Sequence, residues 1–103
     1  MAQLNDVKVE QLDNKNQFII RTNKGTYFQS YDSLIAFYDG KNDKLHLSNK
    51  WDYSKTTLKH LYIFIDSYVF IRAIKEKLEC TNNKRKEIQK LIDNKTIKLD
   101  LEA

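Results

Sequence analysis

The spacing of apolar residues changes in the middle of this chain, at the run Trp51-Asp52-Tyr53-Ser54-Lys55-Thr56-Thr57-Leu58-Lys59. Before this run, apolar and polar residues alternate, as they do in strands with one buried face. After it, apolar residues recur every three or four positions, as they do along one side of a helix. The hydroxyl and acidic residues of the run can accept hydrogen bonds from the first turn of a helix. The pattern therefore predicts a strand-rich first half and a helical second half.

Length and composition indicate one domain. The 103 residues include no proline and only two glycines, so no flexible linker divides the chain. We expect a single domain over residues 1–103, with a strand-rich part over 1–53, a helical part over 54–95 and a final strand over 96–102.

The expected location follows from the cysteine content and from the apolar stretches. A single cysteine, Cys80, excludes an internal disulfide and is typical of proteins of the reducing cytoplasm. Residues 1–6 lack the charged-then-apolar pattern of a secretion signal. The most apolar stretch, residues 61–71, is shorter than the about 20 residues that cross a bilayer. We expect a cytoplasmic protein without a membrane partner.

Alternating residues predict several short strands in the first half, around residues 7–11, 17–22, 26–31, 34–38 and 44–48. Turn-forming residues separate them at 13–16, at 23–25 and at 39–43, and Gly25 can adopt a positive φ. At Tyr31-Asp32-Ser33 the alternation slips by one residue, which a β-bulge or a short bend would explain.

The second half is predicted to hold one long and one short helix. Helical spacing favours the long helix over residues 58–79, although its many Ile, Phe and Tyr residues leave a buried strand as an alternative. Residues 81–83 would end it, a shorter helix would cover 84–94, and a strand would include Ile97, Leu99 and Leu101. The predicted fold class is α+β: an antiparallel β-meander of about four to five strands plus a C-terminal strand, with both helices packed on one face.

Residues suited to catalysis or metal binding do not occur at useful spacings. His46 and His60 lie in different elements, with no cysteine or carboxylate at metal-ligand spacing. Cys80 has no nearby histidine, and two glycines cannot form a glycine-rich phosphate loop. We therefore expect no catalytic residue, no metal site and no cofactor, and the chain is not expected to be an enzyme.

The first candidate binding site is a basic cluster formed by Lys84, Arg85, Lys86 and Lys90. The whole net charge of +4 comes from residues 54–103, because residues 1–53 carry seven cations and seven anions. A helix that begins after Asn83 would place three cations in its first turn, where the helix dipole disfavours them and where an anion binds well. An ordinary solvated helix start, with Glu87 offsetting some charge, is the alternative.

The second candidate binding site comprises Trp51, Tyr53 and Lys55, with Lys50 beside them. Aromatic residues interleaved with lysines can stack on bases and neutralise phosphates. They can equally anchor a protein interface, in which Trp and Tyr are enriched. The alternative is structural, with Trp51 packing over the first turn of the following helix.

Two segments of the chain resemble a group of small uncharacterised proteins of bacteriophages and mobile elements. The first covers residues 27–36 and contains Ser30 and Tyr31; the second is the motif Trp-Asp-Tyr-Ser-x-Thr-Thr at residues 51–57. In these proteins a basic helix and a short strand follow, much like residues 86–101. The resemblance implies a phage or mobile-element origin and transfers no catalytic residue.

Two functions are compatible with these observations. The leading hypothesis is a non-enzymatic binding protein that blocks a host protein or protein–nucleic-acid complex in the host cytoplasm. An anti-CRISPR-type inhibitor of a nucleic-acid-targeting defence complex is one concrete form. The alternative is a DNA- or RNA-binding protein that uses the basic C-terminal helix. A homodimer formed through residues 58–79 is compatible with both.

Overall fold

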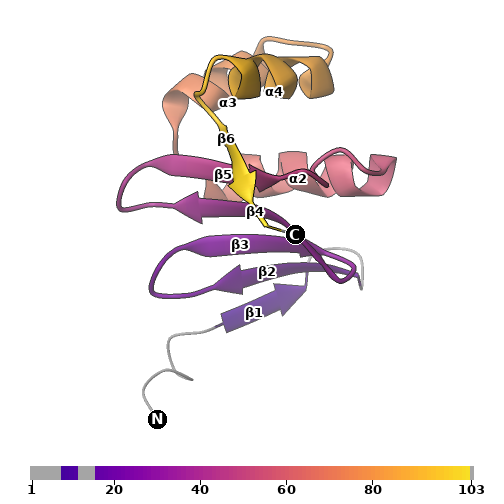
Figure 1. The fold of residues 1–103 in the computed structure, drawn as a ribbon, viewed down its shortest axis with the longest axis vertical. Helices are drawn as coiled ribbons and strands as arrows, with labels where there is room; N and C mark the ends of the chain where they lie inside the picture. The colour runs from indigo at the N-terminus through magenta and orange to yellow at the C-terminus, as the bar shows by residue number, and fades with distance from the viewer. Residues whose placement is uncertain (1–7, 12–15, 103) are drawn as a thin grey trace.

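The computed structural model describes residues 8–11 and 16–102, and within them the chain forms one six-stranded sheet and three helices. The strands lie in the sheet in chain order, as Figure 1 shows: β1 (Lys8–Gln11), β2 (Gln17–Arg21), β3 (Thr26–Ser30), β4 (Ser33–Asp39), β5 (Lys44–Ser48) and β6 (Lys98–Leu101). The helices are α2 (Lys55–Tyr68), α3 (Arg72–Glu79) and α4 (Lys84–Asp93). The expected strand residue Val7 and the expected turn residues 13–15 lie outside the described residues.

The predicted α+β class is confirmed, but the sheet is mixed and not wholly antiparallel. Strands β1 to β5 pair as an antiparallel meander, whereas β6 pairs in parallel with β5. Parallel neighbours need a long crossover connection, and here all three helices lie in that connection. The final strand thus joins the sheet at the edge opposite β1.

The turns are stabilised by the residues that predicted them. Gly25 adopts a φ of 156°, and a Cβ at this position would overlap the Tyr38 carbonyl oxygen and the Phe37 ring. In the β4–β5 turn, Asp39 Oδ1 accepts hydrogen bonds from the backbone N–H groups of Lys41 and Asn42, at 3.1 and 3.2 Å. The first turn therefore requires a residue without a Cβ and the second a carboxylate side chain, and a local sequence pattern can reveal both.

The slip predicted at residues 31–33 has two structural causes. Ser30 pairs directly with Ser33, so Tyr31 and Asp32 form a tight turn in which Tyr31 has a φ of 56°. The β3–β4 register then shifts between Phe28 and Gln29. Of the two expected alternatives, the bend therefore occurs at the predicted residues, and the irregularity in pairing lies next to it on β3.

The single long helix predicted over residues 58–79 is wrong, because the chain leaves the helix at residues 69–71. Val69 and Ile71 have extended backbones, with φ/ψ of −104°/126° and −88°/105°. Val69 and Ile74 are nevertheless both fully buried. The extended link redirects the chain so that α3 also buries an apolar face, and no glycine or proline marks the break.

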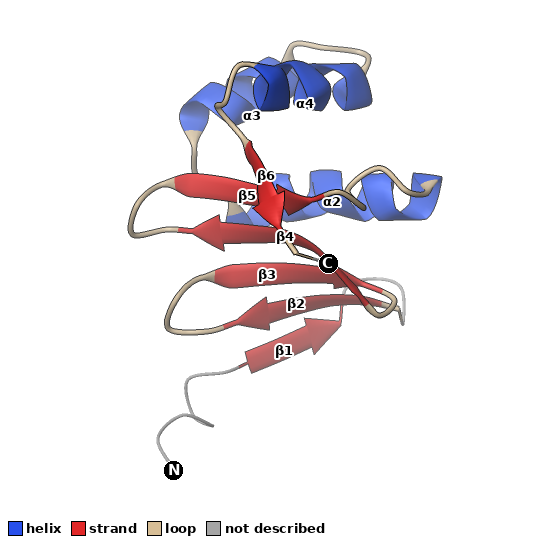
Figure 2. Ribbon diagram, viewed as in Figure 1, coloured by secondary structure: helices blue, strands red, loops and turns tan. Residues whose placement is uncertain are grey.

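The core lies between α2 and one face of the sheet, and it continues between the three helices. Phe64 of α2 stacks on Phe28 of β3 at 5.8 Å between ring centroids. Figure 2 shows α2 behind the sheet, with α3 and α4 side by side beyond its β5–β6 end. The prediction of two helices on one face is therefore corrected: α2 covers the sheet, and α3 and α4 pack together at its end.

Candidate binding surface at the starts of two helices

The start of α2 is fixed by a chain of hydroxyl groups. The Ser54 side chain caps the helix by accepting a hydrogen bond from Thr57 N–H at 3.0 Å. Ser54 Oγ also donates to Thr57 Oγ1, and Thr57 Oγ1 lies 3.0 Å from Ser30 Oγ on β3. The two segments that resemble the phage proteins thus meet in space, since Ser30 lies in the first segment and Ser54 and Thr57 lie in the second. The hydrogen bonds among these three residues hold the start of α2 against β3.

Trp51 lies in the core and not on the surface. Its side chain is only 4% exposed, and the Arg85 guanidinium lies over its ring, 5.8 Å from the centroid. Arg85 Nη2 also donates to Asp52 Oδ2 at 2.6 Å. The Trp51 ring is therefore part of the hydrophobic core, covered by Arg85, and is not an accessible contact for a partner.

These contacts join the two candidate sites into one surface. Arg85 belongs to the basic cluster and Asp52 to the segment before α2, although 33 residues separate them in the chain. Figure 1 shows the starts of α2 and α4 on the same side of the molecule. We name this surface the cationic end and define it by the residues Lys50, Lys55, Lys84, Arg85 and Lys86.

The aromatic component of the cationic end is Tyr53. Its side chain is 55% exposed, and Lys50 Nζ lies 5.9 Å from its ring centroid. Lys55, at the first position of α2, is exposed. Tyr53 is thus an accessible aromatic residue next to a cation.

The α4 start has the predicted cap and the predicted charges. The Asn83 side chain accepts a hydrogen bond from Lys86 N–H at 3.1 Å. Lys84, Arg85 and Lys86 occupy the first turn, where Glu87 is the acidic residue. Lys90 lies in the last turn, where its charge complements the helix dipole, so it stands apart from the cationic end.

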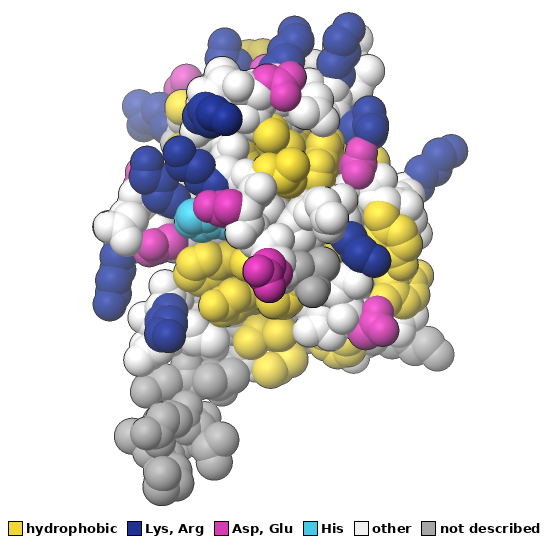
Figure 3. Space-filling view, in the orientation of Figure 1, with side chains coloured by type: hydrophobic (Ala, Val, Ile, Leu, Met, Phe, Trp, Pro, Cys, Tyr) yellow, Lys and Arg dark blue, Asp and Glu magenta, His cyan; other side chains and the backbone are white. Residues whose placement is uncertain are grey.

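Two helix N-termini reinforce the positive potential of the cationic end. Unpaired backbone N–H groups at each helix start carry partial positive charge, which adds to that of the lysines. Asp52 offsets part of this positive charge, because its carboxylate pairs with Arg85. Figure 3 shows Lys and Arg side chains concentrated on the part of the molecule that contains α3 and α4. The arrangement favours a ligand with several negative charges.

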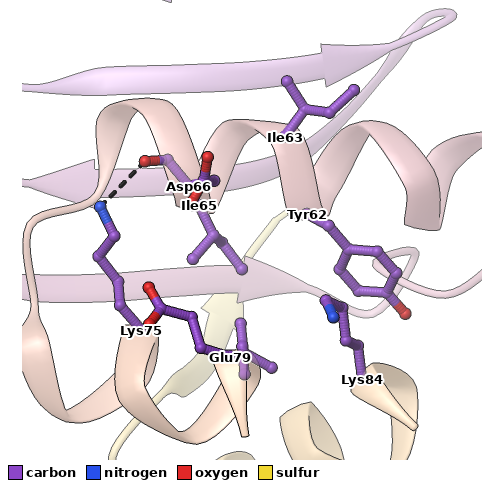
Figure 4. A pocket seen from close by; sticks show the side chains of 8 residues that line it. Tyr62, Ile63, Ile65, Asp66, Lys75, Glu79 and Lys84 are labelled. Atoms are coloured by element: carbon purple, nitrogen blue, oxygen red, sulfur yellow. Dashed lines mark hydrogen bonds between the residues drawn. The ribbon is translucent and has the colours of Figure 1, made fainter. Parts of the chain in front are cut away.

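A pocket of about 280 Å³ lies next to the cationic end, between α2 and α3. Ile65 and Leu78 are buried apolar residues of its lining, and the other lining side chains are Tyr62, Ile63, Asp66, Lys75, Glu79 and Lys84, as Figure 4 shows. Lys75 Nζ donates to the Asp66 backbone oxygen at 2.9 Å. Burial raises the pKa of the Tyr62 hydroxyl above its ordinary value of 10.0, and the Arg85 charge opposes this rise. No pattern in the sequence predicts this pocket, because it depends on the break between α2 and α3 at residues 69–71.

Each of the two histidines lies within hydrogen-bonding distance of another residue, and the cysteine is exposed. His46 Nδ1 lies 2.7 Å from Asp100 Oδ1, and buried His60 contacts the Thr56 backbone oxygen through Nδ1 at 2.8 Å. Cys80 is exposed at the end of α3. Across residues 8–11 and 16–102, no three His, Cys, Asp or Glu side chains are grouped so that they could hold a metal ion.

Within the same described ranges, none of the helices combines the length and the apolar content that a membrane span requires. A family model described as "Family of unknown function (DUF8033)" matches residues 7–94. No curated protein and no solved structure matches the chain.

Proposed function

The chain belongs to DUF8033, a family of unknown function, and we propose that it acts by binding nucleic acid through the cationic end. The observation that carries this proposal is the contact between Arg85 and Asp52, which brings two separate groups of cations together. A phosphate backbone offers regularly spaced negative charges, which one cation would hold only weakly.

The composition of the cationic end supports a phosphate ligand. Lysines at helix starts are unfavourable for the helix itself, by about 0.3–1 kcal/mol each at low salt. An anion bound between them would remove this repulsion and would accept hydrogen bonds from free backbone N–H groups. Tyr53, exposed beside Lys50, adds an aromatic surface on which an unpaired base could stack.

Binding should depend steeply on salt, because neutralised phosphates release their counterions. If about four cations engage duplex DNA, the logarithm of affinity falls against the logarithm of salt concentration with a slope of about −3.6. Fluorescence anisotropy with labelled single- and double-stranded oligonucleotides, measured over a salt series, provides this slope. Absence of binding at micromolar protein in low salt would overturn the proposal.

A second candidate function is the steric block of a host macromolecule, of which an anti-CRISPR-type inhibitor is one form. The specific observation in its favour is the pocket beside the cationic end, since Ile65 and Leu78 could receive an apolar side chain of a protein. This second proposal also includes an origin of the protein in a phage or a mobile element. Tagged protein that recovers a defined host complex from lysate, but binds no free oligonucleotide, would favour it over direct binding.

A further inference from the structure

The pocket between α2 and α3 shares one residue with the cationic end. Lys84 lines the pocket, and it is also the first residue of α4. Its side chain is half-buried, so part of it is covered and part reaches solvent. Burial raises the pKa of the Tyr62 hydroxyl in the pocket lining, and the Arg85 charge opposes this rise, so Arg85 also lies close to the pocket. A ligand that the cationic end holds therefore lies next to this pocket.

Tyr62 is an aromatic residue of the pocket without an aromatic neighbour to stack on. Across residues 8–11 and 16–102, no other ring stacks on the Tyr62 ring, and no group hydrogen-bonds to its hydroxyl. By contrast, Tyr68 of the same helix stacks on Phe64 at 5.8 Å between ring centroids. The Tyr62 side chain is half-buried and lines the pocket. A planar ligand in the pocket can therefore contact this ring without displacing another aromatic side chain.

The two ends of the pocket offer different chemistry. Figure 4 shows Tyr62 and Lys84 at one end, beside the start of α4. Asp66, Lys75 and the Glu79 carboxylate lie toward the other end. There Lys75 Nζ already donates to the Asp66 backbone oxygen at 2.9 Å. The carboxylates of Asp66 and Glu79, in contrast, form no ion pair with any residue that the structure describes. One end thus presents a cation, and the other presents hydrogen-bond acceptors.

The size and the lining of the pocket fit a single nucleobase. Its volume is about 280 Å³, and the buried side chains of Ile65 and Leu78 make part of the lining apolar. Sites that enclose drug-sized ligands measure about 300–1,000 Å³, so this pocket suits a smaller molecule. A nucleobase is planar, has apolar faces and carries polar groups on its edge. Its faces match Ile65, Leu78 and the Tyr62 ring, and the attached sugar and phosphate would stay outside, at the cationic end.

We propose that this pocket holds one unpaired base of the nucleic acid whose phosphates the cationic end binds. This inference rests on the proposed function and adds a base contact to it. Cytosine, adenine and guanine fit best, because each carries an exocyclic amino group that donates to a carboxylate. Thymine and uracil lack an amino group, and their carbonyl oxygens are repelled by the carboxylates of Asp66 and Glu79. A paired base must first leave its duplex, which costs free energy, so single strands are preferred.

Fluorescence anisotropy with the full wild-type chain tests whether a base contributes to binding. Three labelled strands of equal length, on the order of ten nucleotides, are compared: oligo-dC, oligo-dT and an all-abasic strand. All three carry the same phosphate charge, so differences in affinity come from the bases. Stacking of one base on an aromatic ring is worth about fivefold or more, so oligo-dC should bind at least about fivefold more tightly than the abasic strand. It should also bind severalfold more tightly than oligo-dT.

Variants of the chain locate the base. Tyr62→Ala should remove most of the difference between oligo-dC and the abasic strand, whereas Tyr62→Phe keeps the ring and should keep the difference. Asp66→Ala/Glu79→Ala changes two exposed residues and should bring oligo-dC and oligo-dT to equal affinity, even if Tyr62→Ala impairs folding. Tyr53→Ala is the matched control for an aromatic residue outside the pocket lining, and it should keep the preference for oligo-dC.

The methyl NMR signals of Ile65 and Leu78 should shift when oligo-dC binds and stay in place when the abasic strand binds. Equal affinities of wild type for these two strands would overturn the base contact and leave the cationic end as a phosphate site. A preference for oligo-dC that persists in Asp66→Ala/Glu79→Ala would do the same. Methyl signals that do not move with bound oligo-dC would leave the pocket to an apolar side chain of a protein. If no strand binds at low salt, both this inference and the proposed function are wrong.

Discussion

Ser30 Oγ and Thr57 Oγ1 lie 3.0 Å apart, and both residues are fully buried. This hydrogen bond connects the end of β3 to the first turn of α2 across 27 residues of sequence. Thr57 Oγ1 also accepts from Ser54 Oγ, so three hydroxyl groups form one buried chain. The contact sets the position of α2 on the sheet, and with it the position of Lys55 in the cationic end.

Removal of the Thr57 hydroxyl should destabilise the protein. Thr57→Val keeps the side-chain shape but leaves the Ser30 hydroxyl without this partner, which costs about 1–3 kcal/mol for a buried group. Urea unfolding of wild type, Thr57→Val, Ser30→Ala and the double variant measures the effect. The double variant should lose less than the sum of the single losses, because both substitutions remove the same hydrogen bond. Additive losses would contradict the contact.

The two glycines should respond very differently to alanine. Gly25→Ala adds a Cβ that overlaps the Tyr38 carbonyl oxygen in a strained backbone region, so we expect a loss of about 2 kcal/mol or more. Gly40→Ala is the matched control, since its nearest contact would be the Tyr38 ring at 3.6 Å. Its effect should stay within about 0.5 kcal/mol. Thermal unfolding of both variants provides the comparison, and equal losses would contradict the turn geometry.

The β4–β5 turn should weaken in acid. The Asn42 side-chain amide donates to Asp39 Oδ2 at 2.8 Å, and this bond, with those from two backbone N–H groups, lowers the pKa of Asp39 below its ordinary value of 3.8. A carboxylate whose folded pKa is lowered stabilises the fold above the unfolded pKa, and this contribution disappears as the pH falls through the folded pKa.

Asp39→Asn is the variant that isolates this effect. Wild type should be more stable than Asp39→Asn at neutral pH, and the difference should shrink as the pH falls below 3.8. Denaturant unfolding at several pH values measures it. A stability difference that is the same at all pH values would show that the charge of Asp39 has no role.

Asp52→Asn should strengthen nucleic-acid binding. Asp52 now pairs with Arg85 at 2.6 Å and offsets its charge, so its neutralisation leaves Arg85 available to phosphate. We expect the affinity for a DNA duplex to rise a few-fold at low salt, and the salt dependence to become steeper by about one unit of slope. Stability should fall by less than about 1 kcal/mol, since the pair is partly exposed. Unchanged affinity would mean that Arg85 does not contact the ligand.

The helix caps and the hairpin turns could be predicted from sequence because their hydrogen bonds are local. Ser54, Asn83 and Asp39 each bond to backbone N–H groups two or three residues away. Residue type at such a spacing is sufficient to identify them. The basic first turn of α4 was predictable for the same reason.

The features that the sequence could not reveal depend on contacts between distant residues. The helix break at Val69 follows from the burial of Val69 and Ile74 together, without any local breaker. The parallel pairing of β6 depends on where the crossover ends, which periodicity does not specify. Trp51 lies beneath Arg85, 34 positions further along the chain, so the sequence could offer a structural role for Trp51 only as an alternative to a partner contact and could not identify Arg85 as its neighbour.

Charge reversal at the start of α4 tests most directly whether the cationic end binds nucleic acid. The variant Lys84→Glu/Lys86→Glu places acidic residues in the first turn, where they favour the helix dipole, so its stability should equal or exceed that of wild type. Lys24→Glu/Lys41→Glu is the control, with the same change in net charge at two exposed turns of the sheet. Anisotropy with a DNA duplex at low salt should show at least a tenfold weaker affinity for the α4 variant and a much smaller change for the control. Equal affinities of the two variants would contradict the assignment.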